Sequence, residues 1–476
     1  MRRIGVDVGG TNTDAVLLDG GEPIATIKLP TTVDLMDGLV AAISAVLAAQ
    51  SSDDPPVEAV MIGTTQFTNA VIERSRLERV AALRIGLPAS ASLPPGVDWP
   101  DDLRAVVDPL VFMVRGGHEY DGRPIVPLDR DAVRAAAQQI GHAGIRSVAI
   151  SAIFSPLTAE AESDAAEILR DELPDIAVSC SSDLGRIGLL ERENVTMLNA
   201  CLRGLGLATV RAFEDALATV GLDVPAFLTQ NDGTVVRAEV AARTPVMSFA
   251  SGPTNSMRGA AYLSGLSDAV VVDVGGTTSD IGHLRGGFPR QANNVVLVGG
   301  VRTLFRMPDL SPIGLGGGSI VSSADALADG RSTAAIGPRS VGYRITSDAP
   351  VFGGSTLTAT GVAVAAGRAD IGDASLVAHL DAAEVAAHLA EIGRMLEASV
   401  DRVRTSDQPV DLIAVGGGAF LVPDSLAGVA AVHRVAHAGV ANAVGAAMAQ
   451  ISGEVDQVFS GLERSAAIDQ AIEIAS

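Results

Sequence analysis

The sequence predicts an α/β fold that is built around two copies of one strand–turn–strand unit. The first observation is a repeat, because residues 6–20 (VDVGGTNTDAVLLDG) and 272–286 (VDVGGTTSDIGHLRG) match at nine of fifteen positions. Six of the nine matches are consecutive, which is improbable by chance. The second observation is that helical patterns alternate with short apolar runs along the rest of the chain, an order typical of α/β proteins.

Each copy of the repeat reads as a β-hairpin with a glycine-rich tip. A β-branched run, at 4–8 or 270–274, carries an aspartate near its end and turns through Gly-Gly-Thr, and in the first copy a second apolar run follows at 15–18. Elsewhere, helices are predicted ahead of strands at three places, namely 131–142 before 146–154, 158–172 before 176–180, and 380–402 before 411–415.

The chain is predicted to divide into two parts near residue 190. A long helical pattern from 189 to 220 would connect them, although Gly204 and Gly206 interrupt it. On this division, residues 1–190 carry the first hairpin, and residues 191–476 carry the second hairpin and a further glycine turn at 413–420.

Composition excludes several classes of partner. The chain has 476 residues and a formal net charge of −22, and no stretch concentrates arginine or lysine on one face, so neither nucleic acid nor an anionic membrane is an expected partner. No apolar run reaches the roughly 18 to 20 residues of a membrane span, and no secretory signal is recognisable. The two cysteines, Cys180 and Cys201, lie in unrelated contexts. A cytoplasmic location is therefore expected.

The single lysine excludes further chemistries. Lys28 lies in the strand-like run IATIKLP with no motif around it, and every other basic residue is arginine. A P-loop, a protein kinase and a pyridoxal enzyme each need a lysine in a defined motif. We therefore expect an active site that contains no lysine.

Two facing glycine tips are predicted to bind one polyphosphate. Successive N–H groups in such a tip form an anion-binding concavity, and glycine lets the backbone approach the anion closely. The residues assigned to phosphate lie at equivalent places in the two copies: Gly9, Gly10, Thr11 and Thr13 in the first, Gly275, Gly276, Thr277 and Thr278 in the second. Four aspartates at matching positions would hold Mg²⁺, partly through water: Asp7, Asp14, Asp273 and Asp280.

A lone hairpin of this kind is equally well explained as a tight turn with solvated carboxylates. Duplication favours the nucleotide site, and so does a third glycine turn after another strand. That turn, at Gly416, Gly417 and Gly418, would let adenosine lie against bare backbone.

These features resemble those of the actin, Hsp70 and sugar-kinase superfamily, whose two-lobed, ribonuclease H-like fold closes over ATP. More narrowly, the chain resembles the hydantoinase A and 5-oxoprolinase family. The resemblance rests on motifs that span most of the chain in the expected order: VDVGGTNTD (6–14), GTTQFTNAVIER (63–74), ERENVTMLNACLR (191–203), FLTQNDGTVV (227–236), FASGPTNSMRGA (249–260), VDVGGTTSD (272–280) and IGLGGGSI (313–320). By resemblance, Gly316 and Gly317 of the last motif also bind the nucleotide.

The resemblance implies ATP-dependent opening of a cyclic amide such as 5-oxoproline, a hydantoin or another lactam. Moving the γ-phosphoryl group onto the carbonyl oxygen makes that oxygen a leaving group and opens the carbon to water, a step that needs positioning and charge neutralisation. Asp7, Asp273 and Thr277 are predicted to be catalytic. The chain is shorter than the long members of the family and is expected to lack their C-terminal domain, so a second, hydantoinase B-like subunit and an oligomer are expected.

Two other functions stay open at this point. One is a hydroxyl kinase of the sugar-kinase type, for which Asp232 is the candidate base. The other is a non-catalytic, ATP-dependent activator of a partner protein.

Polar side chains that follow strands are predicted to contact the substrate. Thr64, Thr65 and Asn69 follow the strand at 59–62 and start a helix, while Gln230, Asn231 and Asp232 follow the strand at 226–229. Threonine, asparagine and aspartate also favour helix N-caps, so a purely structural role is equally consistent for these six. Asn194, on the long helix, is a candidate by resemblance and could equally be a buried polar residue satisfied locally.

Overall fold

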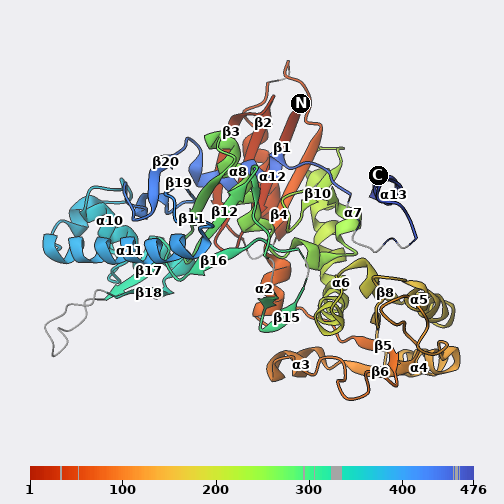
Figure 1. Cartoon of the computed structure of the whole chain (residues 1–476). Helices are drawn as coiled ribbons and strands as arrows, with labels where there is room; N and C mark the ends of the chain where they lie inside the picture. The colour runs from red at the N-terminus through yellow and green to blue at the C-terminus, as the bar shows by residue number, and fades with distance from the viewer. Residues whose placement is uncertain are drawn as a thin grey trace, which may run out of the picture.

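The two hairpins of the repeat lie in two different sheets (Figure 1). The computed structural model describes residues 1–475 apart from 33–34, 52, 293–294, 305, 323–334, 454, 456–458 and 460. The first sheet has the order β10-β9-β4-β1-β2-β3. Its strands are β1 (Arg2–Val8), β2 (Asn12–Asp19), β3 (Glu22–Pro30), β4 (Ala59–Thr64), β9 (Ala226–Thr229) and β10 (Val235–Arg237).

The second sheet repeats the centre of the first. Its order is β13-β12-β11-β19-β20, with β16 also paired to β12. In both sheets a hairpin of antiparallel strands pairs in parallel with a later strand, β4 or β19. The strands are β11 (Ala269–Val274), β12 (Ser279–Arg285), β13 (Phe288–Pro289), β16 (Leu310–Ile313), β19 (Val410–Val415) and β20 (Val429–Arg434).

Helices cover both faces of each sheet, as the alternation of apolar residues along the strands requires. In β2, Val16 and Leu18 pack against α12 (Ala441–Met448), while Ala15 and Leu17 face the core that includes α1 (Leu35–Leu47). In the second sheet, alternate residues of β11 likewise pack against α8 (Ser251–Ser264) on one face and α11 (Ala382–Val403) on the other.

The helices α8 and α12 lie together between the two sheets (Figure 1). Their backbones touch at two glycines. A Cβ on Gly259 would lie 1.8 Å from the carbonyl oxygen of Ala441, and one on Gly445 would lie 1.9 Å from that of Asn255. The absence of side chains at these positions therefore sets the separation of the sheets, and with it the distance between the two hairpin tips.

A third sheet forms a separate layer beside α6 (Leu189–Thr219). The helix α6 is continuous through Gly204 and Gly206, and it packs on α1 and on β7. The sheet has the order β6-β5-β7-β8, and its strands are β5 (Ala81–Leu87), β6 (Leu110–Arg115), β7 (Ser147–Ala152) and β8 (Ala177–Cys180). The helices between these strands in the chain are α3 (Asp101–Val107), α4 (Arg130–His142) and α5 (Glu160–Glu172).

The helices predicted at 131–142, 158–172 and 380–402 are confirmed as α4, α5 and α11, each followed by the predicted strand. The division near residue 190 stays a prediction. The first sheet takes β9 and β10 from beyond that residue, because β9 pairs in parallel with β4.

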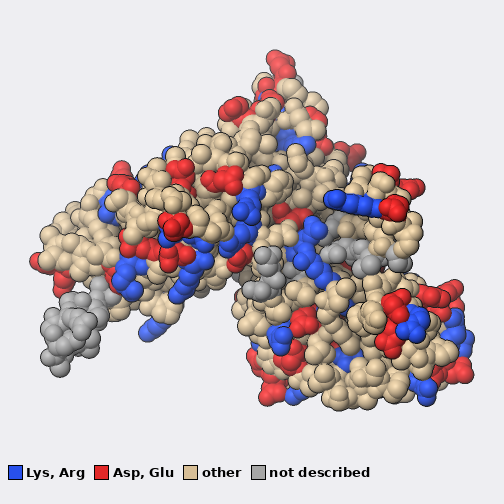
Figure 2. Space-filling model, in the orientation of Figure 1, with Lys and Arg blue, Asp and Glu red and all other residues tan. Residues whose placement is uncertain are grey.

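The remaining elements are short or peripheral. None of the helices in the described residues is long and apolar enough to cross a membrane. On the face shown in Figure 2, acidic and basic side chains are interspersed. The remaining strands and α-helices are α2 (Gln66–Ile72), α7 (Ala238–Ala241), β14 (Val296–Val298), β15 (Val301–Thr303), β17 (Ser319–Ser322), β18 (Ala335–Ser340), α9 (Ile345–Asp348), α10 (Ala359–Ala365) and α13 (Arg464–Ala475).

Candidate functional site

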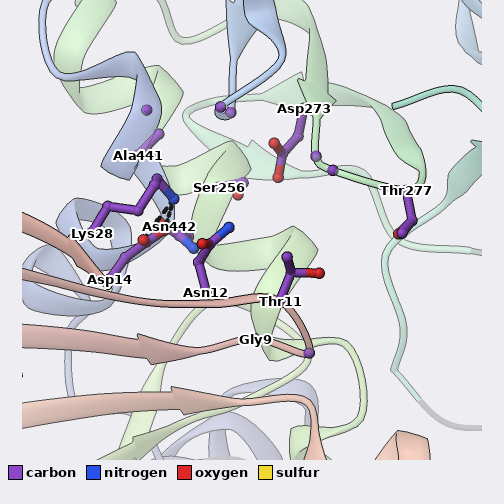
Figure 3. Close-up of a pocket in the computed structure, with 16 residues that line it drawn as sticks. Gly9, Thr11, Asn12, Asp14, Lys28, Ser256, Asp273, Thr277, Ala441 and Asn442 are labelled. Atoms are coloured by element: carbon purple, nitrogen blue, oxygen red, sulfur yellow. Dashed lines mark hydrogen bonds and ion pairs between the residues drawn. The ribbon is translucent and has the colours of Figure 1, made fainter. Parts of the chain in front are cut away.

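The two hairpin tips face one cavity of about 200 Å³, although they lie 266 residues apart in the sequence (Figure 3). The third glycine turn and the start of α12 complete its wall. The lining residues are Gly9, Gly10, Thr11, Asn12, Asp14, Lys28, Ser256, Asp273, Gly275, Gly276, Thr277, Gly416, Gly417, Gly439, Ala441 and Asn442.

Both tips have the same backbone geometry. The N–H of Gly9 donates to the oxygen of Asn12 at 3.0 Å, and the N–H of Gly275 donates to that of Thr278 at 2.9 Å. Within the described residues, the next two N–H groups at each tip, those of Gly10 and Thr11 and of Gly276 and Thr277, have no hydrogen-bond acceptor. Pairs of successive unpaired N–H groups at each side of one cavity are suited to bind an anion.

Several of the predicted nucleotide ligands support the tips from behind. Gly317 donates to the oxygen of Gly275 at 3.0 Å, and Gly418 donates to that of Val274 at 2.7 Å. A Cβ on Gly316 would lie 2.6 Å from the backbone nitrogen of Thr277. Together with Thr13 and Thr278, these three glycines lie outside the cavity lining, whereas Gly416 and Gly417 belong to it.

Two aspartates lie at equivalent places near the ends of the central strands, Asp7 buried in β1 and Asp273 partly exposed in β11. Asp7 accepts hydrogen bonds from the side-chain amides of Asn442 at 3.0 Å and Asn255 at 3.3 Å. Burial, the dominant cause, and the nearby charge of Asp14 raise the pKa of Asp7 to about 6. Asp273 lines the cavity, and burial raises the pKa of its carboxyl, an effect that a hydrogen bond from Ser256 opposes.

Glycines on the neighbouring strands make room for these carboxylates. A Cβ on Gly63 of β4 would lie 2.3 Å from Asp7 Oδ1. Gly416, directly after β19, has a φ of +88°, and its Cβ would lie 2.2 Å from Asp273 Oδ1. The repeat therefore builds each aspartate into a place that a side chain on the next strand would fill.

The second aspartate of each hairpin lies opposite the first in strand register, Asp14 opposite Asp7 and Asp280 opposite Asp273. Burial, followed by the charge of Asp273, raises the pKa of Asp280 to about 7. Asp14 is also buried, but its carboxylate is paired with a cation.

That cation is Lys28, so the expectation of a site without lysine is wrong. Lys28 lines the cavity, and its Nζ lies 2.6 Å from both carboxylate oxygens of Asp14. The side chains meet because β3 pairs with β2 in the register that sets Lys28 opposite Asp14. Both oxygens of Asp14 are thus engaged, and contact with a metal ion would require this pair to open.

The carboxylates fit a magnesium ion that is held largely by its nucleotide. In the part of the chain that the structure describes, no group of three or more His, Cys, Asp or Glu side chains is placed to hold a metal by itself. Mg²⁺ bound with a nucleotide typically uses one or two carboxylates together with phosphate oxygens and water. Asp273, which lines the cavity, satisfies that requirement. Asp7 is buried outside the lining, and its two oxygens accept from Asn255 and Asn442, so contact between Asp7 and a metal ion would require one of these hydrogen bonds to open.

The predicted substrate residues lie in different parts of the structure, and only the first three lie beside a hairpin tip. Thr64, Thr65 and Asn69 lie beside the first tip, where a Cβ on Gly10 would be 3.9 Å from Asn69 Nδ2. The side chain of Thr65 accepts from Asn69 at 3.3 Å, and the N–H of Thr64 donates to Ser251 Oγ at 3.3 Å.

The other candidates do not gather at this cavity. Gln230 lines a second cavity of about 480 Å³. Asn231 is buried and accepts from the N–H of Ala250 at 2.8 Å, while the side chain of Asp232 accepts from Thr234 within its own turn. Asn194 accepts from Trp99 Nε1 at 2.8 Å and donates to the oxygen of Arg302 at 3.0 Å. These hydrogen bonds give Asn231, Asp232 and Asn194 a structural role.

Sequence reasoning missed Lys28 and Asn442. Asn442 has no signal in the sequence, because it reaches Asp7 only through the packing of α12. Lys28 had two signals, its uniqueness in the chain and its place in the strand that follows the first hairpin. Ser256, Gly439 and Ala441 also line the cavity and were not assigned to it.

Two sheets with duplicated hairpins, separated by a helix pair, define the two-lobed fold of the actin, Hsp70 and sugar-kinase-like proteins, as the resemblance predicted. The chain belongs to the hydantoinase/oxoprolinase family. The family model of the hydantoinase/oxoprolinase N-terminal region matches residues 3–173, and that of hydantoinase/oxoprolinase matches residues 192–404.

Among its relatives are subunits of two enzymes. The chain is 26% identical to caprolactamase subunit alpha of Pseudomonas jessenii, over 71% of this chain and 51% of the relative. It is 27% identical to the acetophenone carboxylase gamma subunit of Aromatoleum aromaticum, over 72% of this chain and 50% of the relative. It thus spans about half the length of the relatives it matches.

Solved structures share the fold over nearly the whole chain. The ATP-dependent caprolactamase of Pseudomonas jessenii aligns over 99% of this chain and 75% of its own, with a TM-score of 0.77 and 22% identity. The nucleotide-free structure of acetone carboxylase aligns over 96% of this chain and 71% of its own, with a TM-score of 0.69 and 19% identity.

Proposed function

We propose that the chain is the ATP-binding subunit of an enzyme that activates a cyclic amide, such as a lactam, a hydantoin or 5-oxoproline, for ring opening. The observation that carries the proposal is the single cavity between the two Gly-Gly-Thr tips, with unpaired N–H groups on both sides. Family membership and an ATP-dependent caprolactamase among the similar structures support ATP as the phosphoryl donor and a cyclic amide as the acceptor.

The residues of the cavity supply positioning and charge neutralisation. The N–H groups of Gly10, Thr11, Gly276 and Thr277 would bind phosphate oxygens, and Asp7 and Asp273 would hold Mg²⁺. The metal would neutralise charge on the transferring phosphoryl group. In the proposed reaction the carbonyl oxygen of the amide bonds to the γ-phosphorus and ADP leaves. One water adds to the activated carbon and the C–N bond breaks, which leaves an acyl phosphate. A second water then hydrolyses the acyl phosphate to the ring-opened acid and phosphate.

The substrate would enter beside the first tip. The half-buried Thr65 and Asn69 offer a hydroxyl and an amide group there for a ring carbonyl or N–H. The side chain of Thr64 is buried and accepts from the N–H of Gln66 at 3.3 Å. Because the relatives are named as subunits, we propose that a second, hydantoinase B-like subunit completes the enzyme in the cytoplasm.

The hydroxyl-kinase alternative is less well supported. It needs a base beside the acceptor, and its candidate, Asp232, accepts hydrogen bonds from Thr234 Oγ1 at 2.6 Å and from Thr234 N at 2.9 Å instead of lining the cavity. Amide activation needs no such base before phosphoryl transfer.

The test is a coupled ADP-release screen over lactams, hydantoins, 5-oxoproline and simple sugars, with and without a co-expressed second subunit. ADP release that depends on a cyclic amide, together with the ring-opened acid, is the expected result. A stable phosphorylated sugar would favour the kinase, and slow ATP turnover indifferent to every substrate would favour a non-catalytic activator.

The same assay tests Asp7 and Asp273. Asp7→Asn and Asp273→Asn should each lower amide-dependent ADP release by about 100-fold or more, because they remove charges that hold Mg²⁺ against the phosphates. The melting temperature should stay the same or rise, since burial already disfavours the charged form of both carboxyl groups. Asp223→Asn is the matched control, because Asp223 is exposed. Turnover in both variants equal to that of the control would remove the metal role.

A further inference from the structure

The repeat is not symmetric in charge, and the difference is a lysine. In the first copy the strand after the hairpin sets Lys28 opposite Asp14, whereas in the second copy the equivalent strand β16 sets Pro312 opposite Asp280. Both strands pair antiparallel to their hairpins, so the fold does not need a lysine to build this layer. Lys28 therefore calls for an explanation other than strand pairing.

The pair with Asp14 holds the ammonium group at the cavity wall. Asp14 is 3% exposed, while the Lys28 side chain is 35% exposed at the open edge strand β3. A surface pair of this kind would be worth little, but here one partner is buried and the other borders the cavity. In Figure 3 the Lys28 side chain extends toward Asp14 beside Asn442 and Asn12.

The charge of the cavity needs this group. The charged side chains among its lining residues are Asp14, Asp273 and Lys28, and the carboxylate of Asp7 lies directly behind. The N–H groups of the tips attract a polyphosphate, but the carboxylates of Asp14 and Asp273 repel it unless a cation compensates them. Lysine is suited to the task, because its ammonium is a compact point charge on a flexible stem that can change partners.

We propose that Lys28 binds a phosphate group of the nucleotide, and that Asp14 acts as a positioning residue that holds the ammonium at the cavity until the nucleotide arrives. This inference rests on the proposed nucleotide site and assigns a role to Lys28, the one cationic side chain among the described residues that line it. When phosphate binds, the ammonium of Lys28 shares its donors between Asp14 and a phosphate oxygen, and no covalent bond changes.

Binding measurements on the full chain test the assignment. Lys28→Gln should weaken MgATP binding by about 10- to 100-fold, the usual effect of losing a hydrogen bond between charged groups. It should leave adenosine binding unchanged, because adenosine has no phosphate, and a merely structural role would not separate the two ligands. Lys28→Arg should recover part of the affinity. Arg211→Gln, at an exposed position of α6, is the matched loss of one positive charge and should bind both ligands as wild type does.

Two outcomes separate this inference from the proposed function. Wild type that binds no MgATP would contradict the nucleotide site itself. Wild type that binds MgATP no better than Lys28→Gln would overturn the role of Lys28 alone.

A labelling experiment on the wild-type chain does not depend on any variant. Acyl phosphates of ADP and ATP transfer their acyl group to an amine that lies beside the bound phosphates, with release of the nucleotide. Because Lys28 is the only lysine, one acylated side chain is expected, and excess ATP should protect it. Peptide mapping separates it from the N-terminal amine. Acylation of Lys28 that excess ATP does not reduce would overturn the proposal.

Discussion

At the scale of single residues, the site is a set of four carboxylates, of which Asp7 and Asp14 are buried and Asp273 and Asp280 are partly exposed. Asp7 and Asp273 lie opposite Asp14 and Asp280, so each hairpin brings two negative charges together. Lys28 compensates the first pair, whereas Pro312 lies opposite Asp280 in the second hairpin. Burial, followed by the charge of Asp273, raises the pKa of Asp280 to about 7. The nucleotide-free protein therefore holds unfavourable charge that a bound Mg²⁺ would relieve.

This charge predicts how stability depends on pH. Between the ordinary pKa of 3.8 and about 7, folded Asp280 holds a proton that the unfolded chain releases. Its contribution to stability therefore falls as pH rises through that window, by about 1.4 kcal/mol for each unit of pKa difference. Asp280→Asn should be more stable than wild type at pH 8 and nearly equal at pH 4, in denaturant unfolding with a metal chelator. A constant difference across this range would contradict the raised pKa.

At the scale of elements, the close packing of α8 on α12 fixes the geometry of the site. The helix α8 carries Asn255 and Ser256, and α12 carries Asn442 at its start, so the helices bring polar groups to Asp7 and Asp273. Their approach depends on Gly259 and Gly445. A small increase in separation would move these partners away from both aspartates.

The same substitution in two helices should have opposite effects. Gly259→Ala should destabilise the protein by roughly 2 kcal/mol, because its Cβ would lie 1.8 Å from a backbone oxygen of Ala441. Gly393→Ala in α11 is the control, since its nearest neighbour, Pro423 Cγ, is at an ordinary 3.7 Å, and it should stabilise by about 0.5–1 kcal/mol. Chemical denaturation measures both. If Gly259→Ala were as stable as Gly393→Ala, the close contact would not limit the packing.

At the scale of the whole molecule, a buried ion pair connects the third sheet to α6. Arg84 of β5 is fully buried and makes a bidentate pair with Glu193 of α6, with 2.7 Å between Nε and Oε2. Ser151 of β7 donates to the same carboxylate at 2.6 Å. The third sheet is therefore held to α6 by specific charge pairing, in addition to apolar contact.

Breaking this pair should cost far more than breaking one on the surface. Glu193→Gln leaves a buried guanidinium without its counter-ion and should destabilise by roughly 3 kcal/mol or more. Glu391→Gln removes the partner of Arg394, whose side chain is 68% exposed, and should cost about 1 kcal/mol or less. Urea unfolding of the two variants compares them, and equal costs would show that the buried pair is not needed to hold the third sheet.

Much of the fold could be predicted because its signals are local. The Gly-Gly-Thr tips, the strands that carry Asp7 and Asp273, and the helices α4, α5 and α11 follow from short-range sequence patterns. The tips were assigned to one cavity only because their sequences repeat, since nothing local states that they face each other. The substrate candidates Asn231 and Asp232 illustrate the limit, because the same residue types serve both recognition and turn formation.

The sequence by itself determined the two hairpins and the chemistry of their tips, because backbone turns and strand pairs of neighbouring segments depend on residues close together in the chain. Only the tertiary structure decided which charged and polar side chains contact one another. Lys28 meets Asp14 through strand register, and Asn442 meets Asp7 across 435 residues through helix packing. Such contacts depend on how elements pack after they form, and that packing depends on shape and burial over the whole molecule.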